Sequence, residues 1–206
     1  MAPGFSFAYA FEPDGMAFEH IKELGTELTN VWFFPFAVSD NNGTGTLVQG
    51  ASSDVSAMAT NAAACTPVQT CTLDALIPDY PTPVSVIKID TEGHELVVLA
   101  GADSLISRDR PTILLETPVS AAIIDWAERR RYLVGAACIP GNGTGPSFRW
   151  FNKPDPVHVK MVLLAPEENA ARLREITKEL YGRPAQYRRD LKKFQARTLK
   201  LWNAVP

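Results

Sequence analysis

Apolar runs typical of buried strands alternate along the chain with segments of helical periodicity. The strand-like runs cover residues 5–11, 30–38, 84–90, 111–116 and 132–139. Segments with apolar positions three or four residues apart lie between several of these runs and cover residues 16–24, 93–106 and 119–131. This alternation predicts βαβ units, and therefore an α/β fold built on a doubly wound, mainly parallel sheet.

The pattern departs from this alternation in two regions. Residues 44–48 and 68–73 read as short strands, and residues 50–66 between them contain little to bury and predict a loop. A last strand over residues 157–165 follows a loop rich in Pro and Gly, with no helical pattern before it. We therefore expect it to pair antiparallel with residues 132–139 at the edge of the sheet.

Residues 167–181 and 186–202 each place apolar side chains on one helical face, which predicts two amphipathic helices. These helices divide the chain into a main domain, residues 1–165, and an extension, residues 166–206. The main domain carries 10 Lys and Arg against 18 Asp and Glu, whereas the extension carries 10 against 5. We interpret the basic charge as a solvated helix face rather than a site for nucleic acid, anionic lipid or an acidic partner. The apolar stripe of the extension is compatible with a homodimer.

The composition predicts a globular protein without a membrane segment. The 206 residues are 46% hydrophobic and 21% charged, which is enough for one substantial core. No apolar run approaches the roughly 20 residues of a membrane-spanning helix, and the first residues lack the basic start of a secretory signal. Cys65, Cys71 and Cys138 form an odd set without the paired spacing of a zinc site. We therefore expect a cytoplasmic protein with reduced thiols.

Carboxylates follow three of the predicted parallel strands. Glu12, Asp90 and Glu116 each stand at the end of a strand-like run. Ligands of open parallel sheets bind beyond the carboxyl ends of the strands, and burial alone would not select an acid at each of these positions. Glu12 is placed to accept hydrogen bonds from ribose hydroxyls, although a carboxylate at this position would also suit the N-terminus of the following helix.

Ionisable groups crowd the junction between the strand over residues 84–90 and the next helix. Helix capping would account for one or two of them, so we expect at least part of the cluster to act chemically. An imidazole ionises near neutral pH, which makes His94 a candidate general base, although the position also fits an exposed residue of the first helical turn. Asp90 or Glu92 could take this role instead. With Glu116 these acids could bind Mg²⁺, but nothing in their spacing demands a metal, and we predict none.

Several short motifs occur in order along the chain. The most specific is Lys-Ile-Asp-Thr-Glu-Gly-His-Glu at residues 88–95. The others are Phe-Glu-Pro at residues 11–13, Ala-Val-Ser-Asp at 37–40, Thr-Leu-Asp-Ala-Leu at 72–76, Val-Leu-Ala-Gly-Ala at 98–102 and Arg-Pro-Thr-Ile-Leu-Leu-Glu at 110–116. Together they resemble the FkbM-type methyltransferases. The resemblance covers about residues 7–117 and leaves the basic C-terminal helices outside it.

The resemblance implies a class I methyltransferase fold, which is Rossmann-like, with antiparallel strands at the sheet edge. It also implies S-adenosylmethionine as the methyl donor and a hydroxyl group of a small molecule or sugar as the acceptor. The loops over residues 50–66 and 141–150 would line the pocket and set the identity of that acceptor.

The resemblance also assigns roles to individual residues. Glu12 would bind the ribose of the donor, and Ala37 would lie near its adenine. Asp90 would face the methionine end of the donor or the acceptor. Independently of the resemblance, we expect Glu116, at the end of its strand, to bind the substrate. The catalytic candidates are Asp90, Glu92 and His94.

The chain departs from the family pattern at its N-terminus. Class I methyltransferases begin with a strand and a glycine-rich turn that holds the methionine part of the donor, and residues 5–11 correspond to the second strand of that pattern. The chain would then be a fragment of a longer enzyme, a polypeptide completed by another one, or a protein without the donor site. We favour a fragment, because an open central strand would expose unpaired backbone groups. The alternative function is that of a catalytically inactive binding module. A nicotinamide-dependent oxidoreductase would suit the fold, but its glycine fingerprint is missing.

Overall fold

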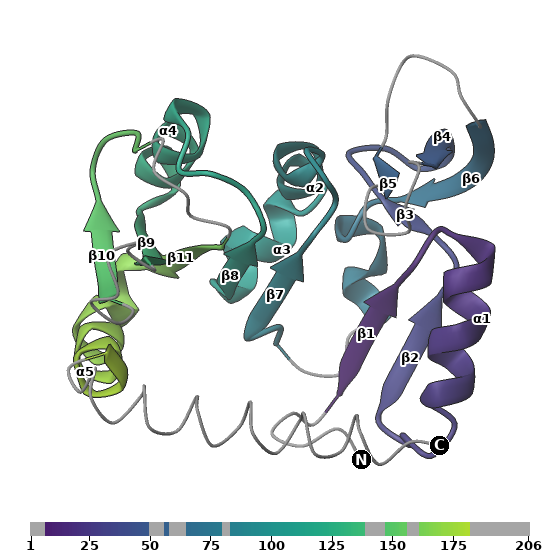
Figure 1. Cartoon of the computed structure of the whole chain (residues 1–206), viewed down its shortest axis with the longest axis horizontal. Coiled ribbons are helices and arrows are strands. Elements are labelled where there is room, and N and C mark those ends of the chain that lie inside the picture. Colours follow the sequence, from purple (N-terminus) through teal and green to yellow (C-terminus); the bar gives the residue numbers. More distant parts are fainter. Residues whose placement is uncertain are drawn as a thin grey trace, which may run out of the picture. The chain divides into compact units, whose positions relative to one another are not determined.

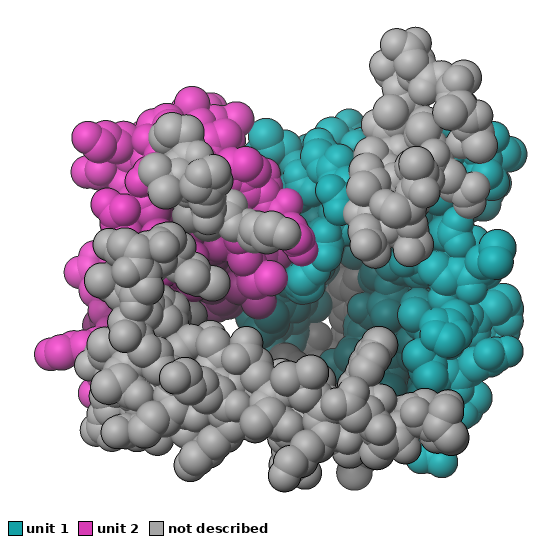
Figure 2. Space-filling model, in the orientation of Figure 1, with its two compact units in different colours: residues 1–111 teal, residues 112–206 magenta. Residues whose placement is uncertain are grey.

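A computed structural model of the chain describes residues 7–49, 56–57, 65–79, 83–138, 147–155 and 161–181 (Figure 1). The chain divides into two compact units, residues 1–111 and residues 112–206, which are coloured separately in Figure 2. Each unit contains fully buried apolar side chains, such as Leu99 in the first and Ile123 in the second.

The first unit opens with a strand, a helix and a second strand. β1 (Ala8–Phe11) and β2 (Val31–Phe34) are parallel neighbours. α1 (Gly15–Leu24) connects them and begins at Asp14, whose side chain accepts hydrogen bonds from two backbone N–H groups of the first turn. The βαβ unit predicted at the start of the chain is therefore confirmed.

Aromatic side chains stabilise the pairing of β1 with β2. Tyr9 stacks on Trp32, with ring centroids 5.3 Å apart, and Phe11 stacks on Phe34 at 5.2 Å. Aromatic pairs at such distances contribute roughly 0.5–1.5 kcal/mol each beyond the burial of their area. The aromatic composition of the two runs therefore adds to the preference for strands that their hydrophobicity already gives.

A second sheet contains strands in the order β3-β6-β4-β5. β3 (Ala37–Val38) is parallel to β6 (Cys65–Cys71), and β6 is antiparallel to β4 (Gly43–Gln49). β5 (Ser56–Ala57) is a short antiparallel neighbour of β4. Pro35 separates β2 from β3, because a proline has no N–H to donate to a strand ladder.

The stretch predicted as a loop over residues 50–66 is only partly irregular. β5 lies within it, and β6 already begins at Cys65, which pairs with Val48 of β4. Residues 50–55 and 58–64 lie outside the described residues. The strand predicted over residues 68–73 is thus present, but its start at Cys65 was missed, because residues 65–67 are all exposed and give no apolar strand pattern.

The rest of the first unit connects this sheet to a pair of short helices. η1 (Asp74–Asp79) is a 3₁₀ helix that follows β6, and β7 (Val86–Ile89) is the strand before the predicted ionisable cluster. The helix predicted over residues 93–106 consists of α2 (Glu95–Ala100) and α3 (Asp103–Asp109). The prediction of one continuous helix is therefore wrong.

The break between α2 and α3 has two physical causes. A Cβ at Gly101 would lie 1.9 Å from the carbonyl oxygen of Ser39, so only glycine allows the chain to approach so closely. Asp74 also binds both sides of the break: its N–H donates to the carbonyl of Gly101 at 3.0 Å, and its carboxylate accepts from the N–H groups of Ser104 and Leu105, each at 2.9 Å. A carboxylate from 30 residues away thus caps α3.

The second unit is built on antiparallel strands in the order β10-β9-β11-β8. They are β8 (Thr112–Leu115), β9 (Tyr132–Cys138), β10 (Ser147–Phe151) and β11 (Val162–Pro166). The antiparallel pairing predicted for the two late strands, β9 and β11, is confirmed. The loop predicted over residues 141–150 is wrong at its end, because β10 begins at Ser147 and pairs with β9.

Helices complete the second unit. α4 (Ala121–Arg130) begins after Ser120, whose hydroxyl accepts a hydrogen bond from the N–H of Ile123. η2 (Glu167–Asn169) leads into α5 (Ala170–Tyr181), which packs against β10 and β11. The first of the two predicted C-terminal helices is therefore confirmed, and the second, over residues 186–202, lies outside the described residues.

The α/β class is confirmed, and the sheets are mixed. β1 with β2 and β3 with β6 are parallel, whereas the other strand pairs named above are antiparallel. The doubly wound, mainly parallel sheet stays a prediction, as does the division of the chain into residues 1–165 and 166–206. Within the part of the chain that the structure describes, no helix combines the length and apolar character needed to cross a membrane.

The cysteines differ in their access to solvent, which makes a labelling experiment informative. Burial raises the pKa of the thiols of Cys71, at the end of β6, and of Cys138, at the end of β9, whereas Cys65 is exposed. Because the thiolate is the reactive form, we expect a thiol reagent at neutral pH to modify Cys65 first. Mass spectrometry of the native chain and of Cys65→Ser would show this order, and equally fast modification of Cys71 would contradict it.

Candidate functional site

The loop between β7 and α2 carries the predicted cluster. Glu92 has a φ angle of 51° and Gly93 one of 102°, and the left-handed region is costly for a residue other than glycine. Glu95, which is buried, holds this turn in place. Its Oε1 accepts hydrogen bonds from the N–H and hydroxyl of Thr91, at 3.3 and 3.2 Å, and from the N–H of Gly93 at 3.0 Å. One acid of the cluster is therefore structural.

The other two acids of the loop, Asp90 and Glu92, are exposed. Asp90 accepts a hydrogen bond of 2.6 Å from the ammonium group of Lys88, in an ion pair whose side chains are 40% and 46% exposed, respectively. Solvent screens such a pair strongly. Both carboxylates are thus accessible to a ligand, and their catalytic roles stay predictions.

The His94 side chain binds a second element of the fold. His94 precedes α2, and its carbonyl accepts hydrogen bonds from the N–H groups of Val97 and Val98, each at 3.1 Å. Its ring makes no capping bond, and Nε2 lies 3.2 Å from the hydroxyl oxygen of Ser39. The imidazole is therefore half-buried and oriented, which a freely exposed residue of a first helical turn would not be.

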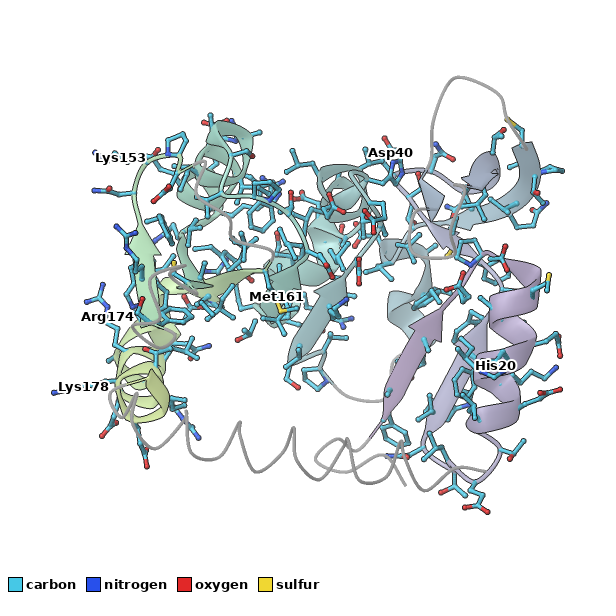
Figure 3. The ribbon with its side chains drawn as sticks, in the orientation of Figure 1. His20, Asp40, Lys153, Met161, Arg174 and Lys178 are labelled. Carbon is cyan, nitrogen blue, oxygen red and sulfur yellow. The ribbon has the colours of Figure 1, made fainter. Side chains whose placement is uncertain are left out.

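Ser39 follows β3 and connects His94 to a further acid. Only 2% of its surface is exposed, and its N–H donates to the carbonyl of Cys71 at 2.9 Å. Its hydroxyl lies 3.3 Å from Oδ1 of Asp40, which also accepts from Nδ2 of Asn41 at 3.1 Å. His94, Ser39 and Asp40 thus form a continuous polar row between the end of β3 and the start of α2 (Asp40 is labelled in Figure 3).

Glu12 stands directly after β1 and is half-buried. Its N–H donates to the carbonyl of Phe34 at 3.1 Å, and its Oε1 accepts from the N–H of Asp14 at 2.9 Å. Asp14 caps α1, so Glu12 closes the turn before the helix and does not occupy the capping position itself. Among the described residues no group hydrogen-bonds to the other carboxylate oxygen, Oε2, which leaves an acceptor for a ligand.

The remaining predicted residues lie in different surroundings. Ala37 is buried in β3, where it forms a small apolar cluster with Leu47 and Val68. Glu116 follows β8 in the second unit and is half-buried. Contact of Ala37 with an adenine and of Glu116 with a substrate stay predictions. Within the described ranges, no three His, Cys, Asp or Glu side chains are grouped as a metal ion would require.

The sequence did not assign a role to Ser39 or Asp74, although both lie in the motifs at residues 37–40 and 72–76. Ser39 comes directly after the short apolar strand β3, and Asp74 stands three residues after the end of β6, at the start of η1. Ser39 positions the imidazole of His94, and Asp74 positions the helix pair that follows the loop. Their partners are far away in the chain, so these positions alone do not reveal what they bind.

The described residues thus combine an α/β fold with an acid after β1 and a polar loop after β7. The sequence profile of the methyltransferase FkbM domain matches residues 9–134, which is more than half of the chain. This chain therefore belongs to the FkbM methyltransferase family.

Comparison with solved structures gives a weaker likeness. The methyltransferase FkbM from Methylobacillus flagellatus KT is similar with a TM-score of 0.46 and 16% sequence identity. The likeness covers 77% of this chain and 36% of that protein, so the chain spans little more than a third of its length. No curated protein sequence matches the chain significantly.

Proposed function

We propose that this chain belongs to an S-adenosylmethionine-dependent O-methyltransferase that acts on a hydroxyl group of a small molecule or sugar. Family membership supports the methyltransferase class. The observation that carries the finer proposal is the oriented imidazole of His94, which lies in the same loop-to-helix segment as two exposed acids. The doubly wound class I fold is part of the same proposal.

Glu12 fits a ribose-containing ligand. Its Oε2, to which no group of the described ranges hydrogen-bonds, is a charged acceptor at the end of a parallel strand. Hydrogen bonds from hydroxyls to a carboxylate are stronger than those to neutral oxygens. In the proposal Ala37 lies near the adenine, and Asp90 faces the methionine end of the donor. When bound, S-adenosylmethionine supplies an electrophilic methyl group on a positively charged sulfur.

His94 is the proposed general base. A hydroxyl oxygen is a weak nucleophile while it keeps its proton, and a positioned imidazole can remove that proton near neutral pH. Asp90 and Glu92 are the alternative bases, since both are exposed in the same loop. Glu116 would bind the acceptor.

Calorimetric titration with S-adenosylhomocysteine tests the donor site. We expect saturable binding, and we expect Glu12→Gln to bind at least about tenfold more weakly, because a hydrogen bond to a charged group contributes roughly 1.5–3 kcal/mol. Glu19→Gln is the matched control, since Glu19 is exposed on α1 and pairs with Lys22. The proposal would be wrong if the chain, also after restoration of any upstream coding sequence, gave no binding heat and formed no product from the donor and a panel of sugars and other alcohols. A non-catalytic binding module would then be the better description.

A further inference from the structure

The row formed by His94, Ser39 and Asp40 restricts where its protons can lie. Oγ of Ser39 is 3.2 Å from Nε2 of His94 and 3.3 Å from Oδ1 of Asp40. A serine hydroxyl has one proton to donate and two lone pairs with which to accept. Ser39 can therefore donate to only one of these neighbours, and the contact with the other is favourable only if that neighbour donates to Oγ.

The carboxylate of Asp40 decides between the two arrangements. An ionised carboxylate only accepts hydrogen bonds, whereas a neutral imidazole can carry its proton on either nitrogen. If the hydroxyl proton pointed to His94, lone pairs of Ser39 and Asp40 would face each other across 3.3 Å. If it points to Asp40, it forms a charge-assisted hydrogen bond, and Oγ of Ser39 then accepts from Nε2–H of His94.

The surroundings keep the three groups in this order. Ser39 is 2% exposed, so its hydroxyl relies on these two neighbours rather than on water. Asn41 donates from Nδ2 to the same oxygen of Asp40 at 3.1 Å, and the hydroxyl of Thr70 donates to the side-chain oxygen of Asn41 at 3.1 Å. These contacts orient the carboxylate toward Ser39.

We propose that Ser39 is a positioning residue that holds neutral His94 in the tautomer with its proton on Nε2, which leaves the lone pair on Nδ1. No group of the described residues hydrogen-bonds to Nδ1, so within this part of the chain its lone pair is not used. The proton that Nδ1 accepts is the hydroxyl proton of the methyl acceptor, and this part of the inference rests on the proposed function. The tautomer itself does not.

The proton and bonding changes balance with these groups alone. The O–H bond of the acceptor breaks, and its proton forms a bond to Nδ1. The acceptor oxygen bonds to the methyl carbon as the carbon–sulfur bond of the donor breaks, and that electron pair returns to sulfur. The imidazolium then carries protons on both nitrogens, and its Nε2–H still donates to Oγ of Ser39. The hydroxyl of Ser39 in turn donates to the carboxylate of Asp40, whose negative charge stabilises the imidazolium.

¹⁵N NMR of the chain labelled with ¹⁵N-histidine shows which ring nitrogen of His94 carries the proton. His94→Ala assigns the resonance by its disappearance. In the wild-type chain, with the ring neutral, we expect the proton on Nε2 and an Hε2 signal protected from exchange with water. Ser39→Ala is expected to lower that protection about tenfold, as the loss of one hydrogen bond of about 1.4 kcal/mol would. Ser107→Ala, at an exposed position of α3, is the matched control.

Asp40→Ala provides a second variant that does not disturb a buried position, because Asp40 is exposed. Without the carboxylate, the hydroxyl of Ser39 is free to donate to Nε2, and the fraction of rings with the proton on Nδ1 should rise. A wild-type ring protonated on Nδ1 would overturn the proposal, and so would Hε2 protection that is unchanged in Ser39→Ala.

Kinetic measurements separate this inference from the proposed function. Ser39→Ala should lower kcat about tenfold and leave KM for S-adenosylmethionine unchanged, because only the orientation of the base is affected. Absence of methyl transfer in every variant, with the expected tautomer, would refute the proposed function and leave the positioning of His94 intact. An active wild-type enzyme with the proton on Nδ1 would refute the inference and leave the function intact.

Discussion

Replacement of His94 by alanine is expected to lower the rate of methyl transfer by about 10²–10⁴-fold, the usual contribution of a positioned general base. Binding of S-adenosylhomocysteine should be unchanged, since the proposed ribose acceptor, Glu12, lies at the end of β1. The fold should also survive, because α2 is capped by the backbone carbonyl of His94 and not by its ring. The expected signature is thus a loss of kcat without a loss of donor affinity.

The rate of methyl transfer in the wild-type chain and in His94→Ala is measured as the release of S-adenosylhomocysteine, with an acceptor that supports turnover. His20→Ala is the control, because His20 is exposed on α1 (labelled in Figure 3). A normal rate in His94→Ala would exclude the imidazole as the base. Glu92→Gln and Asp90→Asn would then identify which of the exposed acids takes that role.

Replacement of Gly101 by alanine is expected to be the most destabilising of the small substitutions considered, at about 3 kcal/mol or more, near or above the upper end for overpacking. The new Cβ would lie 1.9 Å from the carbonyl oxygen of Ser39 and 2.9 Å from its carbonyl carbon. Both are backbone atoms, so neither can move aside as a flexible side chain would. Relief requires a shift of α2 relative to β3, which also disturbs the hydrogen bond between Ser39 and His94.

The free energy of unfolding in urea, measured for Gly101→Ala, for Gly15→Ala and for the wild-type chain, tests this prediction. Gly15 is the first residue of α1, and a Cβ there meets no atom within 4 Å. The same chemical change should therefore stabilise the chain at position 15, by roughly 0.4–1 kcal/mol, through the lower entropy of the unfolded state. Equal effects at the two positions would show that the approach of Ser39 to Gly101 is not as tight as the structure indicates.

The early part of the fold was predictable because its signals are local. The aromatic and β-branched runs form β1 and β2. Asp14, the acid directly before the segment of helical spacing, caps the N-terminus of α1. The antiparallel pairing of β9 with β11 followed from the lack of a helical pattern before the last strand. In each case the residues that decide the structure lie within the element or directly beside it.

The break between α2 and α3 could not be predicted for the opposite reason. The apolar spacing continues through it, and Val98 and Leu105 are both buried as one helix would require. What interrupts the helix is the backbone of Ser39 and the carboxylate of Asp74, neither of which is near in the sequence. β10 was missed for the same reason, because it is a strand through its hydrogen bonds to β9, a separate segment of the chain.

The sequence predicted where the ionisable cluster lies, but not which of its residues are buried and structural and which are exposed. Glu92 and Glu95 are the same residue type three positions apart, yet one is exposed and the other is buried as the acceptor of three hydrogen bonds. The difference follows from the turn at Gly93, which directs the two side chains to different environments. The partner of His94 was likewise hidden, because Ser39 is 55 residues earlier in the chain.

Because Asp74 caps α3, we expect the residues at positions 74 and 102 to vary together among relatives. Loss of this acid leaves two N–H groups of the first turn of α3 without their acceptor, and Ala102, which occupies the capping position, has no side-chain oxygen to replace it. Relatives that lack an acid at position 74 should therefore carry Ser, Thr, Asp or Asn at position 102, where the helix would cap itself. Covariation of these two positions across the family is the evolutionary trace that such a long-range cap should leave.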